Sequence, residues 1–341
     1  MWYISRMAKP IYISLIFFLL SSIPAVLIAH HGFQIYLAGI LVFFGAYITI
    51  QAQRCKIVNT AILLQIAYVT ASSIHMIYHH VVTGISRPQG LFSNVNFTAQ
   101  MLELSLPVLV SLAFNKSIKG IPKWLLYGGI AINLLALLIT QTRGAWISAV
   151  IALGILLFCV KGWRGILAGV TTVGVFACIQ YNTIAGRIST MSSASNGQNI
   201  ERLNGWLVTP KMIMDFPLGM GFNNFKYYYP AYMLPDAKEV LIHPHNLFLG
   251  IAADAGILSA ISFSCFVGFL AWYIVTNIRY IPDTFYYIFA LGCATALLTV
   301  VLHGMVDYTL KNQSIMVFCM LEAGFCVGMI DYYKCSALNR K

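Results

Sequence analysis

The chain has 341 residues, of which 59% are hydrophobic and 9% charged, and its formal net charge is +11. Its mean hydropathy is +0.78. A soluble domain carries about a quarter charged residues and under half apolar ones, so this composition excludes a soluble globular protein and a disordered one. The composition predicts an integral membrane protein, in which the positive charge reflects topology and indicates no nucleic-acid partner.

Apolar runs long enough to cross a bilayer as helices recur along the chain, without the alternation typical of a membrane β-barrel. They predict an all-α polytopic membrane protein of about ten transmembrane helices, with residues 1–341 forming a single membrane domain. The run at 246–275 is long enough to include a bent or interfacial piece. The predicted helices cover residues 11–29, 33–50, 57–78, 97–114, 123–141, 145–160, 165–181, 246–275, 284–305 and 313–332.

The basic residues predict the orientation, because Lys and Arg are retained on the cytoplasmic side of a membrane. With ten helices and both termini inside, most Lys and Arg fall in short inner loops or tails. Those left on the outer side lie mainly in one long segment, residues 182–245. A segment this long in a compact protein is usually functional, and its mixed polar composition predicts an ordered lid with a flexible patch at 192–199.

The cysteines indicate neither a disulfide framework nor a zinc site, since none lies in the long outer segment and most lie within apolar runs. We therefore expect no metal centre.

Ionisable side chains collect at the outer ends of the predicted helices, where charged groups near a bilayer tend to mark function. Guanidinium groups bind phosphate oxygens in bidentate fashion, and a His of near-neutral pKa is suited to taking a proton from a hydroxyl. The combination predicts transfer chemistry on a phosphate-bearing lipid. The residues are Arg87, Arg143, Arg202, His243, His245, Asp254 and Asp307.

Each of these residues also has a structural interpretation. Arg143 could anchor a helix end by reaching the headgroups, and Arg87 and Arg202 could be solvated loop charges. His245 could be an interfacial side chain beside the capping residue Asn246, with His243 as its structural neighbour. Glu103 and Glu322, single acids within helices, are expected to be buried and paired or protonated, with a role in transport as the alternative.

Four segments in order resemble the O-antigen ligase and polymerase superfamily, polytopic enzymes that act on undecaprenyl-diphosphate-linked glycans. They are Arg87–Asn96 before a helix, Thr142–Trp146 between two helices, Arg202–Phe225 in the long segment, and His245-Asn246. The family's ligase pattern can be laid on His245, Asn246 and Gly256, and its last position falls on Ser259, a mild departure. The resemblance covers about residues 87–310.

The resemblance implies a GT-C-like fold and a metal-independent, inverting transfer without a cofactor. By this likeness Arg143 and Arg202 would hold the diphosphate of the donor, and His245 would activate the acceptor hydroxyl; these three are the expected catalytic residues. The long segment would be periplasmic, and the protein would lie in the bacterial inner membrane. The expected substrate-binding residues are Arg87, Asn96, Trp146, Trp206, Asn246 and His243.

Several functions remain open on this evidence. The leading expectation is an O-antigen ligase that moves a finished glycan from undecaprenyl diphosphate to lipid A–core. A repeat-unit polymerase with a growing glycan as acceptor, and transfer of an oligosaccharide to a protein hydroxyl, share the same donor chemistry. A membrane transporter is less favoured, because no internal repeat is evident and the charges gather at one face rather than at the midplane.

Overall fold

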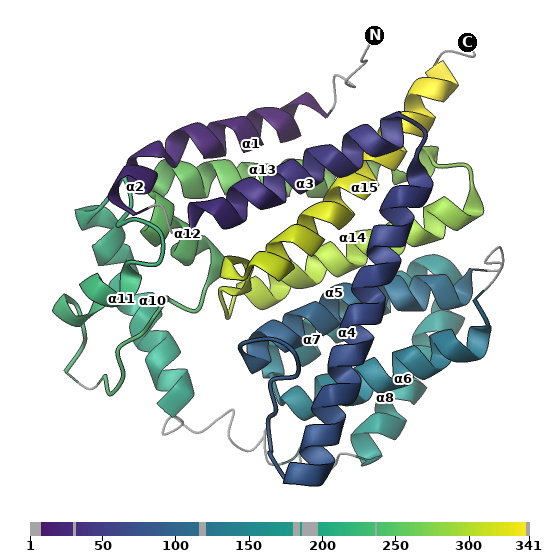
Figure 1. The fold of residues 1–341 in the computed structure, drawn as a ribbon, viewed down its shortest axis with the longest axis horizontal. Helices are drawn as coiled ribbons and strands as arrows, with labels where there is room; N and C mark the ends of the chain where they lie inside the picture. The colour runs from purple at the N-terminus through teal and green to yellow at the C-terminus, as the bar shows by residue number, and fades with distance from the viewer. Residues whose placement is uncertain are drawn as a thin grey trace.

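The computed structural model describes residues 8–29, 32–115, 121–179, 185, 197–235 and 237–338. Throughout these residues the regular structure is helical, which confirms the predicted all-α polytopic fold (Figure 1). The elements are α1 (Lys9–Ser21), α2 (Ile23–Ile28), α3 (Phe33–Gln51), α4 (Cys55–Thr83), α5 (Val95–Phe114), α6 (Lys123–Thr140), α7 (Arg143–Lys161), α8 (Trp163–Ile179), α10 (Gly197–Asp215), α11 (Phe225–Tyr228), η1 (Tyr229–Ala231), α12 (Leu247–Ala255), α13 (Ile257–Asn277), η2 (Ile278–Tyr280), α14 (Thr284–Gly304), η3 (Thr309–Lys311) and α15 (Gln313–Leu338).

Nine helical segments within the described residues are long and apolar enough to cross a membrane. They coincide with nine of the ten predicted runs, with α1 and α2 together forming the first. The remaining predicted run, 165–181, corresponds to α8, which is 17 residues long over the described part. The protein is therefore a multi-pass membrane protein in contact with a lipid bilayer.

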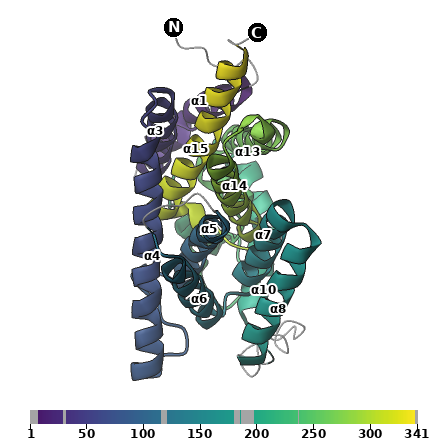
Figure 2. The same ribbon diagram turned by 90° about the vertical axis from the view of Figure 1, so that its right-hand side faces the viewer.

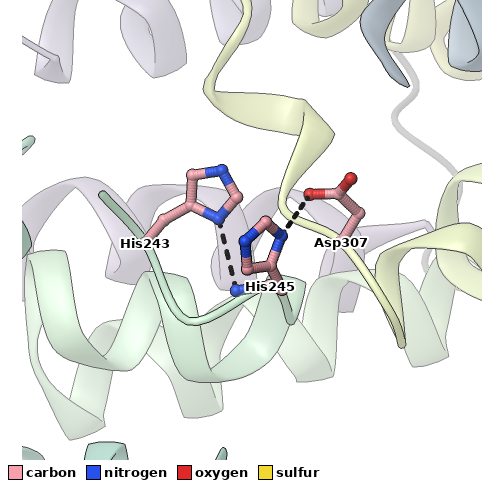
Figure 3. Close-up of side chains that lie close together, drawn as sticks. All are labelled: His243, His245 and Asp307. Atoms are coloured by element: carbon pink, nitrogen blue, oxygen red, sulfur yellow. Dashed lines mark hydrogen bonds and ion pairs between the residues drawn. The ribbon is translucent and has the colours of Figure 1, made fainter. Parts of the chain in front are cut away.

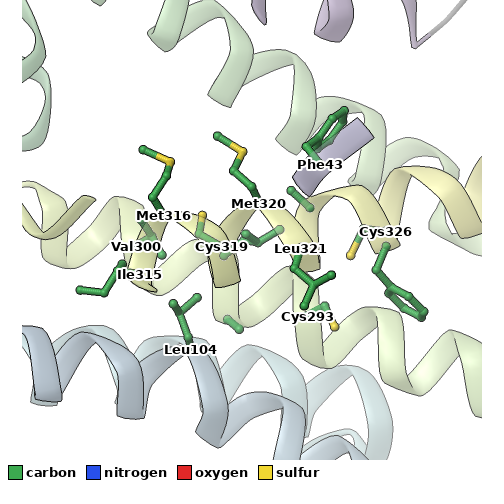
Figure 4. Close-up of a cluster of buried hydrophobic side chains, with 14 of the residues drawn as sticks. Phe43, Leu104, Cys293, Val300, Ile315, Met316, Cys319, Met320, Leu321 and Cys326 are labelled. Atoms are coloured by element: carbon green, nitrogen blue, oxygen red, sulfur yellow. The ribbon is translucent and has the colours of Figure 1, made fainter. Parts of the chain in front are cut away.

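The centre of the bundle is built on α5, α14 and α15. Helix α5 packs along α14, and α15 packs along α3. Almost every side chain from Thr98 to Ala113 is buried. A cluster of sulfur-containing and aliphatic side chains fills the space between these helices (Figure 4). The backbones of α3 and α15 approach closely at Gly324, where a β-carbon would lie 2.5 Å from the carbonyl oxygen of Phe43; small residues permit such contacts between membrane helices.

The remaining helices flank this centre. Figure 2 shows α4 running along one side of the bundle, with α6 beside it, and α8 packs on α7. Helix α1 packs along α13, and α10, α11 and α12 gather at the left-hand end of Figure 1.

The predicted long run at 246–275 divides into α12 and α13 at Gly256, which confirms the expected bend. Gly256 has a φ of 93°, a conformation that L residues rarely adopt. A β-carbon there would lie 2.7 Å from the carbonyl carbon of Leu218. The backbone N–H groups of Met220 and Gly221 donate to the carbonyl oxygens of Ala253 and Asp254, at 2.9 and 3.1 Å. The segment after α10 is thus fixed against the end of α12.

The long segment predicted at 182–245 contains α10, α11 and η1 within its described part. Buried side chains of α10, such as Val208 and Met212, pack with Phe225, Tyr229 and Leu241 in a small apolar core of their own. Of the flexible patch predicted at 192–199, residues 192–196 lie outside the described residues, and 197–199 begin α10.

Candidate active site

The chain enters α12 through a tightly held turn that contains His245. Asn246 caps the helix, because its side-chain oxygen accepts hydrogen bonds from the backbone N–H groups of Phe248 and Leu249, each at 3.0 Å. His245 has a φ of 49°, in the left-handed region. The indole Nε1 of Trp206, on α10, donates to the carbonyl oxygen of His245 at 3.2 Å. The turn therefore fixes the backbone from which the His245 ring projects.

The imidazole of His245 is oriented by Asp307, which lies between α14 and η3. The His245 Nδ1 and Asp307 Oδ1 atoms are 3.3 Å apart (Figure 3), and the two side chains are 22% and 3% exposed. The second carboxylate oxygen of Asp307 accepts a hydrogen bond of 2.6 Å from the Asn96 side-chain amide. In the tautomer that donates Nδ1–H to Asp307, the Nε2 atom carries the lone pair that a general base needs.

Charge states in this cluster follow from its burial. Burial alone would raise the pKa of Asp307, but the hydrogen bond with His245 and the nearby His243 and His303 hold that pKa below its usual range. His243 is buried, and desolvation lowers its pKa to about 3, although the Asp307 charge opposes the shift. Asp307 is therefore ionised and His243 neutral near pH 7. His243 Nδ1 accepts from the backbone N–H of His245 at 3.2 Å.

A chain of hydrogen bonds joins this cluster to Arg87. Thr142 Oγ1 donates to the side-chain oxygen of Asn96 at 3.2 Å. The guanidinium of Arg87 donates from Nε to the carbonyl oxygen of Thr140 at 2.8 Å, and its Nη2 lies 3.5 Å from Thr142 Oγ1. The loop before α5, the start of α7 and the turn after α14 are thus tied together around His245.

These elements surround a cavity of about 620 Å³. Arg143 and Gly144, in the first turn of α7, line it, and so does Arg202 of α10. The N-terminal residues of α5 also face the cavity. The full set of lining residues is Arg87, Asn94, Val95, Asn96, Gln141, Thr142, Arg143, Gly144, Glu201, Arg202, Lys238, Glu239, Leu241, His245, His303 and Val306.

The electrostatics of this cavity favour an anion. Four cationic side chains face it against two carboxylates, those of Glu201 and Glu239. Glu201 is in addition engaged in structure, because its Oε1 accepts from the backbone N–H of Lys238 at 2.9 Å. The first turns of α5 and α7 add the partial positive charge of helix N-termini, whose free N–H groups bind phosphate oxygens.

A smaller cavity of about 280 Å³ adjoins the first. His243 and Asp307 line it together with Ile242 and Phe97, and Asn96 and His245 line both cavities. The His245 ring therefore stands between a cationic cavity and a smaller one that contains no Arg or Lys among its lining residues.

The structure brings most of the predicted site residues together. Arg87, Asn96, Arg143, Arg202 and His245 line the larger cavity. His243 lines the smaller one, while Trp206 and Asn246 hold the turn at His245.

Trp146 lies apart from both cavities. Its indole Nε1 donates to the carbonyl oxygen of Leu137 on α6 at 2.9 Å, and its ring packs against the apolar core. The geometry thus assigns Trp146 to helix packing, and the substrate contact expected of it stays a prediction.

Three side chains could offer ligands to a metal ion. The donor atoms of His243, His245 and Asp307 lie within 4.8 Å of one another. Each side chain already makes a hydrogen bond within the protein: His243 to the backbone N–H of His245, and Asp307 to the His245 ring and to Asn96. A metal ion bound through the atoms that make these hydrogen bonds would replace the bonds by metal–ligand bonds.

Sequence reasoning missed one residue of the cavity wall, His303, which is the partner of the buried acid Glu103. Their Nδ1 and Oε2 atoms are 2.6 Å apart although 200 residues separate them. The one signal in the sequence is the position of His303 four residues before Asp307, which places both near one face at the end of α14.

A comparison with known families identifies part of the chain. Residues 128–264 match the family model described as O-antigen ligase. The match runs from α6 into α13 and includes Arg143, Arg202 and His245, whereas Arg87, Asn96, His303 and Asp307 lie outside it. The resemblance found in the sequence is thereby confirmed for residues 128–264 of the stretch 87–310. No curated protein matches the chain.

Proposed function

We propose that the protein, of which residues 128–264 match the family model described as O-antigen ligase, is a glycosyltransferase that moves a glycan from undecaprenyl diphosphate to a hydroxyl of lipid A–core. The reaction takes place at the periplasmic face of the bacterial inner membrane. The long segment that contains α10 lies at that face and covers the site.

One observation carries this proposal: His245, oriented by Asp307 at 3.3 Å, stands at the wall of a cavity that Arg87, Arg143 and Arg202 also line. A base next to a cluster of guanidinium groups is what attack by a hydroxyl and departure of a diphosphate require. In this assignment the larger, cationic cavity receives the diphosphate of the donor. The smaller cavity beside His243 receives the acceptor hydroxyl.

The reaction is a single displacement. His245 Nε2 takes the proton of the acceptor hydroxyl, and the resulting oxygen attacks the anomeric carbon of the donor sugar. The bond between that carbon and the diphosphate oxygen breaks with inversion, and the electron pair leaves with the diphosphate. Arg143 and Arg202, with Arg87, stabilise the leaving charge as preorganised donors. Asp307 stabilises the imidazolium that forms on His245.

This mechanism assigns no step to a metal ion or a cofactor. Because the guanidinium groups supply the positive charge, we expect purified protein to retain its transfer activity in excess EDTA. The added metal ions Mg²⁺ and Mn²⁺ should leave the rate unchanged. Loss of activity in the chelator, with recovery on adding either metal, would assign His243, His245 and Asp307 to a metal site instead.

A deletion in the source strain tests the function and separates the related ones. Surface glycolipids and the undecaprenyl-linked pool are compared on gels. A ligase is expected to leave lipid A–core without glycan while long chains accumulate on the carrier lipid. Core that carries a single repeat unit would indicate a polymerase. Unchanged gels in both fractions would contradict both and favour a protein acceptor or transport.

Complementation of the deletion links the phenotype to the site. The wild-type chain is expected to restore glycan on lipid A–core, and His245→Ala is expected to fail although it inserts at the wild-type level. Arg279→Lys serves as a control, because this exposed residue lies in η2 and stacks on Tyr280. Restoration by His245→Ala would overturn the assignment of the base.

A further inference from the structure

A buried pair of a histidine and a carboxylic acid lies at the wall of the larger cavity. His303 of α14 and Glu103 of α5 face each other with Nδ1 and Oε2 2.6 Å apart, and their side chains are 1% and 0% exposed. The other carboxylate oxygen of Glu103 accepts a hydrogen bond from Ser148 Oγ of α7. Both oxygens of the acid are thus satisfied. Three helices meet at this point, which makes the orientation of the imidazole a property of the bundle rather than of one loop.

His303 reaches the cavity next to Arg143. It belongs to the residues that line the cavity, together with Gly144. A β-carbon on Gly144 would lie 3.2 Å from Cδ2 and 3.6 Å from Nε2 of His303. The Nε2 edge of the ring is therefore packed against the residue that directly follows Arg143, at the start of α7. The ring therefore reaches the cavity beside the first turn of α7, and Arg143, the first residue of that helix, lines the same cavity.

The pairing sets the chemistry of Nε2, the ring nitrogen that does not face Glu103. Burying a carboxylate as deeply as Glu103 is costly unless it has a hydrogen-bond donor beside it. The Nδ1–H of His303 is that donor, and it stabilises the acid. A carboxylate behind Nδ1 in turn stabilises the imidazolium, whose Nε2–H is a charged hydrogen-bond donor. An anion that enters the cavity favours the same state.

We propose that His303 is a further diphosphate-binding residue, an imidazolium that donates Nε2–H to a phosphate oxygen of the lipid donor beside Arg143. Glu103 and Ser148 are positioning residues that hold the ring and its charge. The inference rests on the proposed function, because the ligand is the diphosphate that the larger cavity is proposed to receive. It adds a cation that the guanidinium groups do not supply, placed on the side of the cavity formed by α14.

Binding of farnesyl diphosphate to the purified full-length protein in lipid nanodiscs tests the proposal, with farnesyl monophosphate as the comparison. The change His303→Gln is expected to weaken diphosphate binding about ten-fold or more, the size expected for one hydrogen bond to a charged group. Glu103→Gln should have a similar effect, and the double variant should bind no more weakly than the weaker single one, because both changes remove the same interaction. Binding of the monophosphate should change less.

Glu322→Gln is the matched control. Glu322 is also a fully buried helix carboxylate, and it accepts from Gln65 Nε2 at 2.8 Å, away from the residues that line the cavity. This variant should bind farnesyl diphosphate as the wild type does. Equal losses for diphosphate and monophosphate in His303→Gln and Glu103→Gln, or independent and additive losses, would assign the pair to structure and overturn the proposal.

A second test leaves the pair itself intact. Gly144→Ala places a methyl group 2.7 Å from Val306 Cγ2 and 3.2 Å from the His303 ring, which must shift. Gly154→Ala, on the same helix, adds a methyl group with no atom within 4 Å and serves as the control. Weaker diphosphate binding is expected in the first variant and unchanged binding in the second. Wild-type binding by Gly144→Ala would contradict the proposed contact.

The two proposals fail in different ways. If neither the wild type nor any variant binds farnesyl diphosphate, the proposed donor site is wrong. If Arg143→Ala abolishes binding while His303→Gln and Glu103→Gln bind as the wild type does, the donor site stands and only the role of His303 is overturned.

Discussion

Two buried carboxylates, Asp307 and Asp331, lie at opposite ends of α15 and have different surroundings. Asp307 precedes the helix and is bound by the His245 ring, the Asn96 amide and the backbone N–H of Tyr308. Asp331 lies near the end of the helix. Its oxygens accept hydrogen bonds from the hydroxyl groups of Tyr47, at 3.0 Å, and of Tyr273.

The comparison shows that burial alone does not mark a functional acid. Tyr47 and Tyr273 come from α3 and α13, so the acid between them joins three helices of the bundle. Asp307 instead orients an imidazole that borders two cavities. What distinguishes the site is a proton-accepting partner next to a cavity that cationic side chains also line.

The largest expected effect comes from removing the charge of Asp307. The change Asp307→Asn should lower the rate of glycan transfer about 10²- to 10⁴-fold, because His245 loses the charge that stabilises its imidazolium. Asp331→Asn should leave the rate near that of the wild type. Initial rates with purified protein and lipid-linked glycan measure both. Equal loss in the two variants would remove the distinction between the two ends of α15.

The next largest effect concerns the guanidinium groups. Arg143→Lys and Arg202→Lys should each lower the transfer rate by roughly 10²-fold, because an ammonium group keeps the charge but loses the bidentate geometry. Arg279→Lys, an exposed change far from the cavity, should have no effect. Rates that are unchanged in both cavity variants would show that charge alone suffices there.

The stability of the folded protein in acid depends on His243, which lies near Asp307. Its pKa is lowered to about 3 in the folded protein, below the value of about 6.5 expected in the unfolded chain. Between these values the unfolded chain binds the extra proton, so acidification should reduce stability by about 1.4 kcal/mol per pH unit. Asp307 does not offset this loss above about pH 4, since its pKa is also lowered and it stays ionised.

The change His243→Asn keeps an acceptor for the backbone N–H of His245 and removes the titrating ring. Unfolding midpoints at pH 7 and pH 5 should therefore differ less for this variant than for the wild type. An equal loss of stability on acidification in both proteins would contradict a neutral, buried His243.

The smallest effect is expected from a change at Asp331, near the C-terminal end of α15. Asp331→Asn retains one acceptor oxygen and replaces the other by an N–H donor, so only one tyrosine hydroxyl can donate as before, and the change should cost about 1 kcal/mol of stability. A lower thermal midpoint with an unchanged transfer rate is the expected pair of results. A strong loss of transfer without a change in midpoint would place a functional group at this end as well.

The sequence predicted those parts of the molecule that depend on local chemistry. Apolar runs located the helices, because a spanning helix needs about 20 apolar residues. A membrane tolerates charged residues only at its surface or in a functional site, and this rule indicated Arg143, Arg202 and His245 as site residues. The structure places all three around one cavity.

Contacts between distant residues were beyond sequence reasoning. Glu103 looked like a single acid in an apolar helix, and only the packing of α5 on α14 reveals its partner His303. Trp146 stands three residues after Arg143 in a motif, yet its indole donates to Leu137 of α6 and is not among the residues that line the cavity. Pairing across helices depends on register, which no local pattern contains.

The most direct test of the central claim is transfer by the purified protein in proteoliposomes. Undecaprenyl-diphosphate-linked glycan and lipid A–core are supplied, and the glycan joined to lipid A–core is measured over time for the wild type, His245→Ala and Asp331→Asn. Product is expected with the wild type and Asp331→Asn, with a near-complete loss in His245→Ala. Product formation by His245→Ala at the wild-type rate would contradict the assignment of His245 as the base.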